Sequence, residues 1–102
     1  MIHVIATVEL NQGCREDYLR ILKEVVSKVK AEPGCLAYEP TVDIASGLPV
    51  QADVRQDVVT IVEAWENLDA LFNHLKMPHL ESYREATKGY VRNLSVQVLQ
   101  PA

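Results

Sequence analysis

The chain has 102 residues, a formal net charge of −4, 48% hydrophobic residues and 24% charged residues. This length fits one domain with one hydrophobic core, and the composition is ordinary for a water-soluble globular protein. The absence of a basic block argues against nucleic acid as a partner, and no apolar run approaches the roughly 20 residues of a membrane span. We therefore expect a single domain over residues 1–102, located in the cytoplasm and without a secretory leader.

The first half of the chain changes its hydrophobic period twice. Alternating apolar side chains over residues 2–10 predict a strand with one buried face. From Arg15 onward, apolar residues recur at every third or fourth position, which is typical of a helix, and Pro33 followed by glycine ends it. A second alternating segment over residues 36–43 predicts another strand. Pro40 cannot donate a hydrogen bond to a neighbouring strand, so this strand is expected at an edge of the sheet.

The second half of the chain begins with a loop and returns to strand pattern. Turn-forming and charged residues over 45–57 predict the loop, and the β-branched run over 58–65 predicts a third strand. Asn67 is a plausible N-cap for a short helix, and Pro78 interrupts that helix and begins a new one. The expected inner stripe of the short helix is Leu68, Leu71, Phe72 and Leu75. Alternation over residues 91–99 predicts the last strand.

The predicted order of elements is β-α-β-β-α-β, which defines an α+β sandwich of the ferredoxin-like kind. Its two helical stretches cover only one face of the sheet. The uncovered face carries His3, Ile5 and Thr7 and is therefore partly apolar. An apolar open face on a small sheet usually marks an association surface, and two-fold pairing is the commonest kind. We expect a homodimer joined through these faces, or a higher oligomer built from it.

Five short stretches, in a fixed order, resemble a known family. They are Pro33-Gly34-Cys35-Leu36 with Tyr38, Glu63 with Trp65-Glu66, His74-Leu75 with Pro78-His79 and Tyr83, Ala86 with Lys88-Gly89, and Leu99-Gln100-Pro101. This set is similar to the antibiotic-biosynthesis-monooxygenase family, and most of all to the small bacterial quinol monooxygenases, over essentially the whole chain. The resemblance implies a dimeric α+β barrel of ferredoxin-like subunits with a pocket between sheet and helices. It also implies oxidation of quinols or related phenols by O₂ without flavin, haem or metal.

The chain departs from part of that family. Members that oxidise polyketide anthrones carry an Asn shortly before the Trp and a Tyr soon after it. The corresponding neighbourhood here contains Ile61, Glu63 and Leu71. The mechanism of those members therefore does not transfer residue by residue, and the chemistry must be argued from the residues that are present.

Candidate acid/base groups lie in one dense segment of the chain. Glu63 shares a strand face with apolar side chains and Trp65, so its carboxylate must find a partner or take up a proton. His74 or His79 is a candidate general base near neutral pH, with Glu63 orienting it. We favour His74, because its helix is expected to cover the sheet opposite Trp65. The two histidines are five residues apart with a proline between them, which does not fit a metal-binding pair on one helix.

Candidate substrate-binding residues are aromatic. Trp65 and Phe72 are predicted to form the flat wall on which an aromatic ring stacks, and Tyr38 and Tyr83 to donate hydrogen bonds to a quinol oxygen. For Trp65 the alternative role is packing in the core or an interface, and for the two tyrosines it is packing in the core. Two arginines are expected to be solvated or ion-paired: Arg84 and Arg92.

The leading functional hypothesis is a cofactor-independent monooxygenase acting on a small aromatic and O₂. Deprotonation of a quinol gives an electron-rich anion that reduces O₂ directly, so the protein supplies a base, an oxyanion donor and a dry cavity. The sequence has no Gly-rich phosphate loop, haem-type motif or metal-ligand spacing, so no cofactor and no metal are expected. Two alternatives stay open. One is an isomerase of a small carbonyl compound, and the other is a non-catalytic binder of quinones or similar aromatics.

Overall fold

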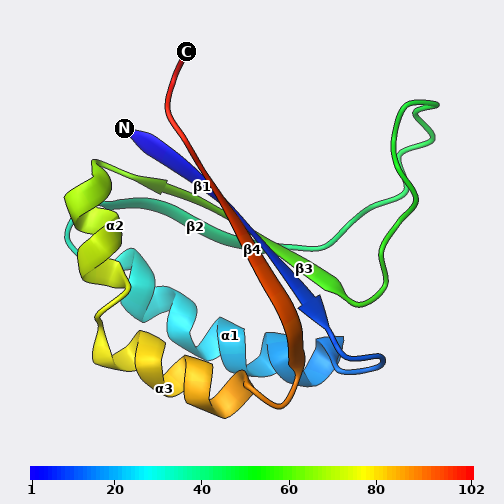
Figure 1. Ribbon diagram of the computed structural model, residues 1–102, viewed down its shortest axis with the longest axis horizontal. Helices are drawn as coiled ribbons and strands as arrows, with labels where there is room; N and C mark the ends of the chain where they lie inside the picture. Colours follow the sequence, from blue (N-terminus) through cyan, green and yellow to red (C-terminus); the bar gives the residue numbers. More distant parts are fainter.

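A computed structural model describes all residues from Met1 to Ala102. The elements in chain order are β1 (Ile2–Leu10), α1 (Arg15–Lys30), β2 (Cys35–Thr41), β3 (Val58–Trp65), α2 (Leu68–His74), α3 (Pro78–Thr87) and β4 (Val91–Leu99). The strands form one antiparallel sheet in the order β2-β3-β1-β4, and the helices lie on one side of it (Figure 1). The ferredoxin-like α+β prediction is confirmed, with the second helical stretch divided into α2 and α3. No helix is long and apolar enough to cross a membrane.

The helix-side face of the sheet forms the core, but its coverage is uneven. Residues of β1 and β3 on this face are buried against α1. On β4, Leu94, Val96 and Val98 lie on the same face, because they pair with Val8, Ala6 and Val4 of β1. Even so, Leu94 is 56% exposed, whereas Val8 is buried. The helices therefore stop short of β4 and leave an opening along that strand.

The turn after α1 packs closely against the start of α2. Gly34 adopts a φ of +81°, and a Cβ at this position would lie 2.6 Å from the Cβ of Ala70. The backbone N–H of Glu66 donates to the Gly34 carbonyl at 2.9 Å. A glycine is needed here for both its backbone conformation and its lack of a side chain. This turn carries Glu32, whose side chain it directs into the core.

The predicted inner stripe of α2 is wrong except for Leu71. Asn67 caps the helix as expected and accepts a hydrogen bond from the N–H of Ala70 at 2.9 Å. The buried residues of the helix are Ala70, Leu71 and His74, whereas Leu68, Phe72 and Leu75 are 48%, 51% and 43% exposed. The contact between Ala70 and the Gly34 turn sets the rotation of this short helix. Since apolar residues lie on both sides of the helix, their pattern alone did not fix which side faces inward.

The long segment between β2 and β3 is without regular secondary structure, as predicted, and projects away from the helices (Figure 1). Asp43 and Arg55 join its two ends through an ion pair of 2.8 Å. The hydrogen bonds that the side chain and the backbone N–H of Arg55 donate to Asp43 lower the pKa of Asp43 to about 2. Pro40 lies on β2, which is an edge strand as its sequence indicated.

Candidate active site

A small cavity of about 90 Å³ lies between the helix-side face of the sheet and the α2–α3 segment. Most of its wall is apolar and comes from β1, β3, β4 and the start of α3. The polar and charged residues on the wall are Tyr38, Glu63, His74, Tyr83 and Arg84. An apolar cavity with a few converging polar groups is the usual form of a small-molecule site. Four of the seven predicted site residues therefore meet on one wall.

A buried carboxylate that was not among the predicted site residues, Glu32, lies next to this cavity. Both oxygens of Glu32 are 3.0 Å from Nδ1 of His74, and Oε2 is 2.6 Å from Nε2 of His79. A buried carboxylate is stable only with such partners, and an ionised carboxylate only accepts hydrogen bonds. Both nitrogens are therefore assigned as donors to Glu32. The residue expected to orient the histidines was Glu63, and in the structure Glu32 takes that position.

His74 is held in one orientation from three sides. Besides the bond to Glu32, its ring lies 4.7 Å from the Trp65 ring and 5.7 Å from the Tyr38 ring, between centroids. Burial lowers the pKa of His74 although the hydrogen bond to Glu32 acts in the opposite direction. The imidazole is therefore neutral at neutral pH.

The lone pair of His74 faces the cavity. With the proton on Nδ1, the lone pair of the neutral ring resides on Nε2. No protein hydrogen bond engages Nε2, and no buried side-chain nitrogen or oxygen lacks a partner, so Nε2 must be open to the cavity that His74 lines. A neutral imidazole that is fixed at Nδ1 and free at Nε2 is the arrangement of a general base.

Glu63 lies on the cavity wall in a different role from the one predicted. Its Oε1 accepts the indole N–H of Trp65 at 3.0 Å, and it forms no hydrogen bond with either histidine, whose partner is Glu32. Burial raises the pKa of Glu63 to about 7, and the bond from Trp65 offsets part of this rise. Near neutral pH the carboxyl group therefore exists in both protonation states. By the same reasoning as for His74, its second oxygen has no protein partner and opens onto the cavity.

The predicted aromatic wall is not formed by Trp65 and Phe72. Trp65 is completely buried, with His74 across its ring and Glu63 at its N–H, and it does not reach the cavity. Phe72 lies on the outer side of α2. The Trp65 ring instead packs against the imidazole of His74. The phenol rings that the cavity wall does offer are those of Tyr38 and Tyr83.

The two predicted tyrosines differ in what their hydroxyl groups can do. The Tyr83 hydroxyl is hydrogen-bonded to that of Tyr18, a fully buried residue of α1. The Tyr38 hydroxyl has no protein partner. Burial, together with the nearby charge of Glu63, raises the pKa of Tyr38, so its hydroxyl keeps its proton. Tyr38 can therefore donate a hydrogen bond to a bound molecule.

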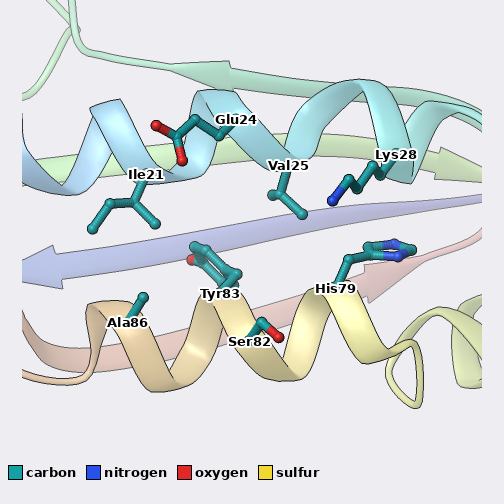
Figure 2. Close-up of a pocket in the computed structure, with 8 residues that line it drawn as sticks. All are labelled: Ile21, Glu24, Val25, Lys28, His79, Ser82, Tyr83 and Ala86. Carbon is teal, nitrogen blue, oxygen red and sulfur yellow. The ribbon is translucent and has the colours of Figure 1, made fainter.

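His79 lies outside the cavity. Figure 2 shows it at one end of a groove between α1 and α3, next to Lys28. This groove measures about 240 Å³ and contains none of Tyr38, Glu63 or His74. His79 reaches the site only through Glu32. No group of three or more His, Cys, Asp or Glu side chains is arranged to hold a metal ion.

Comparison with known proteins identifies the class of this domain. Residues 1–86 match the sequence profile of the family described as antibiotic biosynthesis monooxygenase. The chain belongs to this family. The curated protein YgiN of Escherichia coli strain K12, described as "probable quinol monooxygenase", is 36% identical over 99% of this chain and 98% of its own length.

Solved structures share the fold. PA3566 from Pseudomonas aeruginosa superposes with a TM-score of 0.81 and 23% identity, covering 99% of this chain and 93% of its own. Rv0793 from Mycobacterium tuberculosis superposes with a TM-score of 0.79 and 24% identity, covering 99% of this chain and 94% of its own. At such identities the likeness concerns the fold, and the chemistry depends on the cavity.

Proposed function

We propose that the protein is a cofactor-independent monooxygenase that oxidises a quinol or a related small hydroxylated aromatic with O₂. The observation that carries this proposal is the His74 imidazole, neutral, held at Nδ1 by Glu32 and open at Nε2 to an apolar cavity. Family membership and the similarity to the protein described as a probable quinol monooxygenase support the same conclusion.

The proposed reaction needs no electron source other than the substrate. His74 takes the proton of one phenolic hydroxyl, and the resulting phenolate places electron density on the ring, where O₂ forms a C–O bond. The O–O bond then breaks. One oxygen atom converts a ring C–H to C–OH, the two phenolic hydroxyls become carbonyls, and the second oxygen atom leaves as water. The four electrons that O₂ accepts all come from the ring, so the atoms and electrons balance.

The remaining residues of the cavity support this reaction through charge and solvent exclusion. Tyr38 donates a hydrogen bond to the phenolate oxygen, which stabilises the charge that forms when the proton leaves. Glu63, with a pKa of about 7, returns a proton to the oxygen that leaves as water. The apolar wall excludes bulk water and so protects the reactive intermediates.

The test of this proposal compares histidine variants. His74→Ala should lower kcat for hydroquinone oxidation by about 10²- to 10⁴-fold, which is the usual effect of losing a general base. Binding of the oxidised quinone should change little, because a quinone has no proton to give. His3→Ala is the matched control, because His3 lies on the opposite face of the sheet. Wild-type turnover in the His74→Ala protein would refute the assignment of the base.

An isomerase is the second candidate function, and one observation favours it. A base and a carboxyl group with a pKa of about 7 share one cavity, as proton transfer between two carbons of a carbonyl compound requires. Oxygen consumption separates the two reactions. A protein that isomerises small hydroxycarbonyl compounds and consumes no O₂ with any quinol belongs to this second class.

The homodimer, the single domain and the cytoplasmic location belong to the same proposal. The open sheet face carries Ile5 and Val62 side by side, and Val62 is 39% exposed, which supports association through this face. Light scattering at micromolar concentration measures the mass directly. A monomer mass would remove the basis for dimerisation through the sheet.

A further inference from the structure

Arg84 is a cation without a carboxylate partner at the edge of the cavity. The sequence predicts that Arg84 and Arg92 are solvated or ion-paired. Arg92 lies 3.7 Å from Glu9, but Arg84 forms no ion pair, and its one hydrogen bond is a long contact of 3.4 Å to the Leu75 carbonyl. Its charge nevertheless acts on the site, because it lowers the pKa of both His74 and Tyr83.

Arg84 stands between two adjoining hollows. The inner one is the cavity of about 90 Å³ that contains His74. The outer one measures about 310 Å³ and lies at the end of α3 against β4. The two share Val8, Tyr83, Arg84 and Leu94 on their walls, so they form one continuous cleft. The other cation of the outer hollow, Lys88, is paired with Glu85 at 2.7 Å. Arg84 is therefore the unpaired positive charge of this cleft.

The sizes of the hollows limit what each one holds. A dry protein cavity of about 150 Å³ binds one benzene molecule. The inner cavity, at about 90 Å³, thus has room for no more than a single ring, part of which extends into the outer hollow. The outer hollow is wide enough for a substituent on that ring. A fused two-ring quinol does not fit inside the inner cavity as it stands.

We propose that the substrate is a single-ring quinol with a carboxylate-bearing side arm, and that Arg84 binds the carboxylate in the outer hollow. This inference rests on the proposed function for the identity of the ring. A planar guanidinium matches a carboxylate with two parallel hydrogen bonds. The hydroxyl end of the ring then lies toward His74 and Tyr38, and the arm points out along α3.

The experiment measures binding separately from turnover. The probes are para-hydroxyphenylacetate and para-cresol, which share the ring and differ in the carboxylate, and neither forms a quinone by simple oxidation. We expect the wild-type protein to bind the acid about 10-fold more tightly than the cresol in calorimetry, since hydrogen bonds to charged groups are strong but Arg84 is exposed. Arg84→Gln should bring this ratio close to one, and Arg92→Gln, the matched control, should keep it.

Turnover with hydroquinone and with homogentisate, its carboxymethyl counterpart, separates this inference from the proposed function. The role of Arg84 is overturned if Arg84→Gln keeps the wild-type ratio of affinities for the acid and the cresol. It is also overturned if the wild-type protein binds neither phenol. If the ratio responds as expected but no quinol consumes O₂, carboxylate recognition stands and the oxidation fails. If hydroquinone is oxidised but the wild-type protein does not prefer the acids, the oxidation stands and this inference fails.

Discussion

Glu63→Gln should stabilise the protein at alkaline pH. Glu63 is 5% exposed, and burial raises the pKa of its carboxyl group from 4.5 to about 7. This shift corresponds to about 3 kcal/mol. The folded chain binds the proton more tightly than the unfolded chain does. The stability associated with that proton is therefore present below about pH 4.5 and is lost as the pH rises through about 7.

The glutamine does not ionise, and its amide oxygen can still accept the Trp65 N–H. We expect the free energy of unfolding of Glu63→Gln to exceed that of the wild type by up to about 3 kcal/mol at about pH 8, and by little at about pH 5. Urea unfolding followed by Trp65 fluorescence measures both values. Glu24→Gln, at an exposed position of α1, is the control. A difference that is the same at both pH values would show that Glu63 is not a buried, titrating carboxyl group.

Two further predictions concern the support of His74. Gly34→Ala should lower the free energy of unfolding by more than about 2 kcal/mol. The new Cβ would both strain the backbone at a φ of +81° and clash with the Cβ of Ala70. Gly13→Ala, with a similar φ but open space, should cost only about 1 kcal/mol in the same urea experiment, and equal losses would remove the clash from the explanation. Glu32→Gln should shift the titration of His74, followed by NMR, to lower pH and reduce turnover about tenfold or more, because the carboxylate favours the imidazolium. An unchanged His74 titration would contradict the hydrogen bond on which the base assignment depends.

Local patterns in the sequence were sufficient to predict the fold. β3 was predicted over residues 58–65 and has these bounds, because alternation and flanking turn residues are local signals. β2 ends at Thr41, two residues earlier than predicted, where the chain turns toward the Asp43–Arg55 pair. That pair joins residues 12 positions apart, which periodicity does not detect.

The candidate site was predicted only in part, because its geometry depends on distant contacts. Glu32 and His74 are 42 residues apart, and nothing local to Glu32 marks it as a buried carboxylate. The one available signal was its place directly before the Pro33-Gly34 turn, where the side chain of a helix end can point back into the core. Trp65 was recognised as part of the site, but its burial beneath His74 could not be derived from strand alternation, which fixes a face and not what covers it.

The fate of isotopically labelled oxygen tests the central claim most directly. Metal-stripped wild-type protein should convert a quinol under oxygen-18 gas to a hydroxyquinone that carries one labelled oxygen atom, with the second labelled atom in water. His74→Ala should form the same product about 10²- to 10⁴-fold more slowly. A quinone without label, formed together with hydrogen peroxide, or no consumption of oxygen by the wild-type protein, would contradict the proposed monooxygenase reaction.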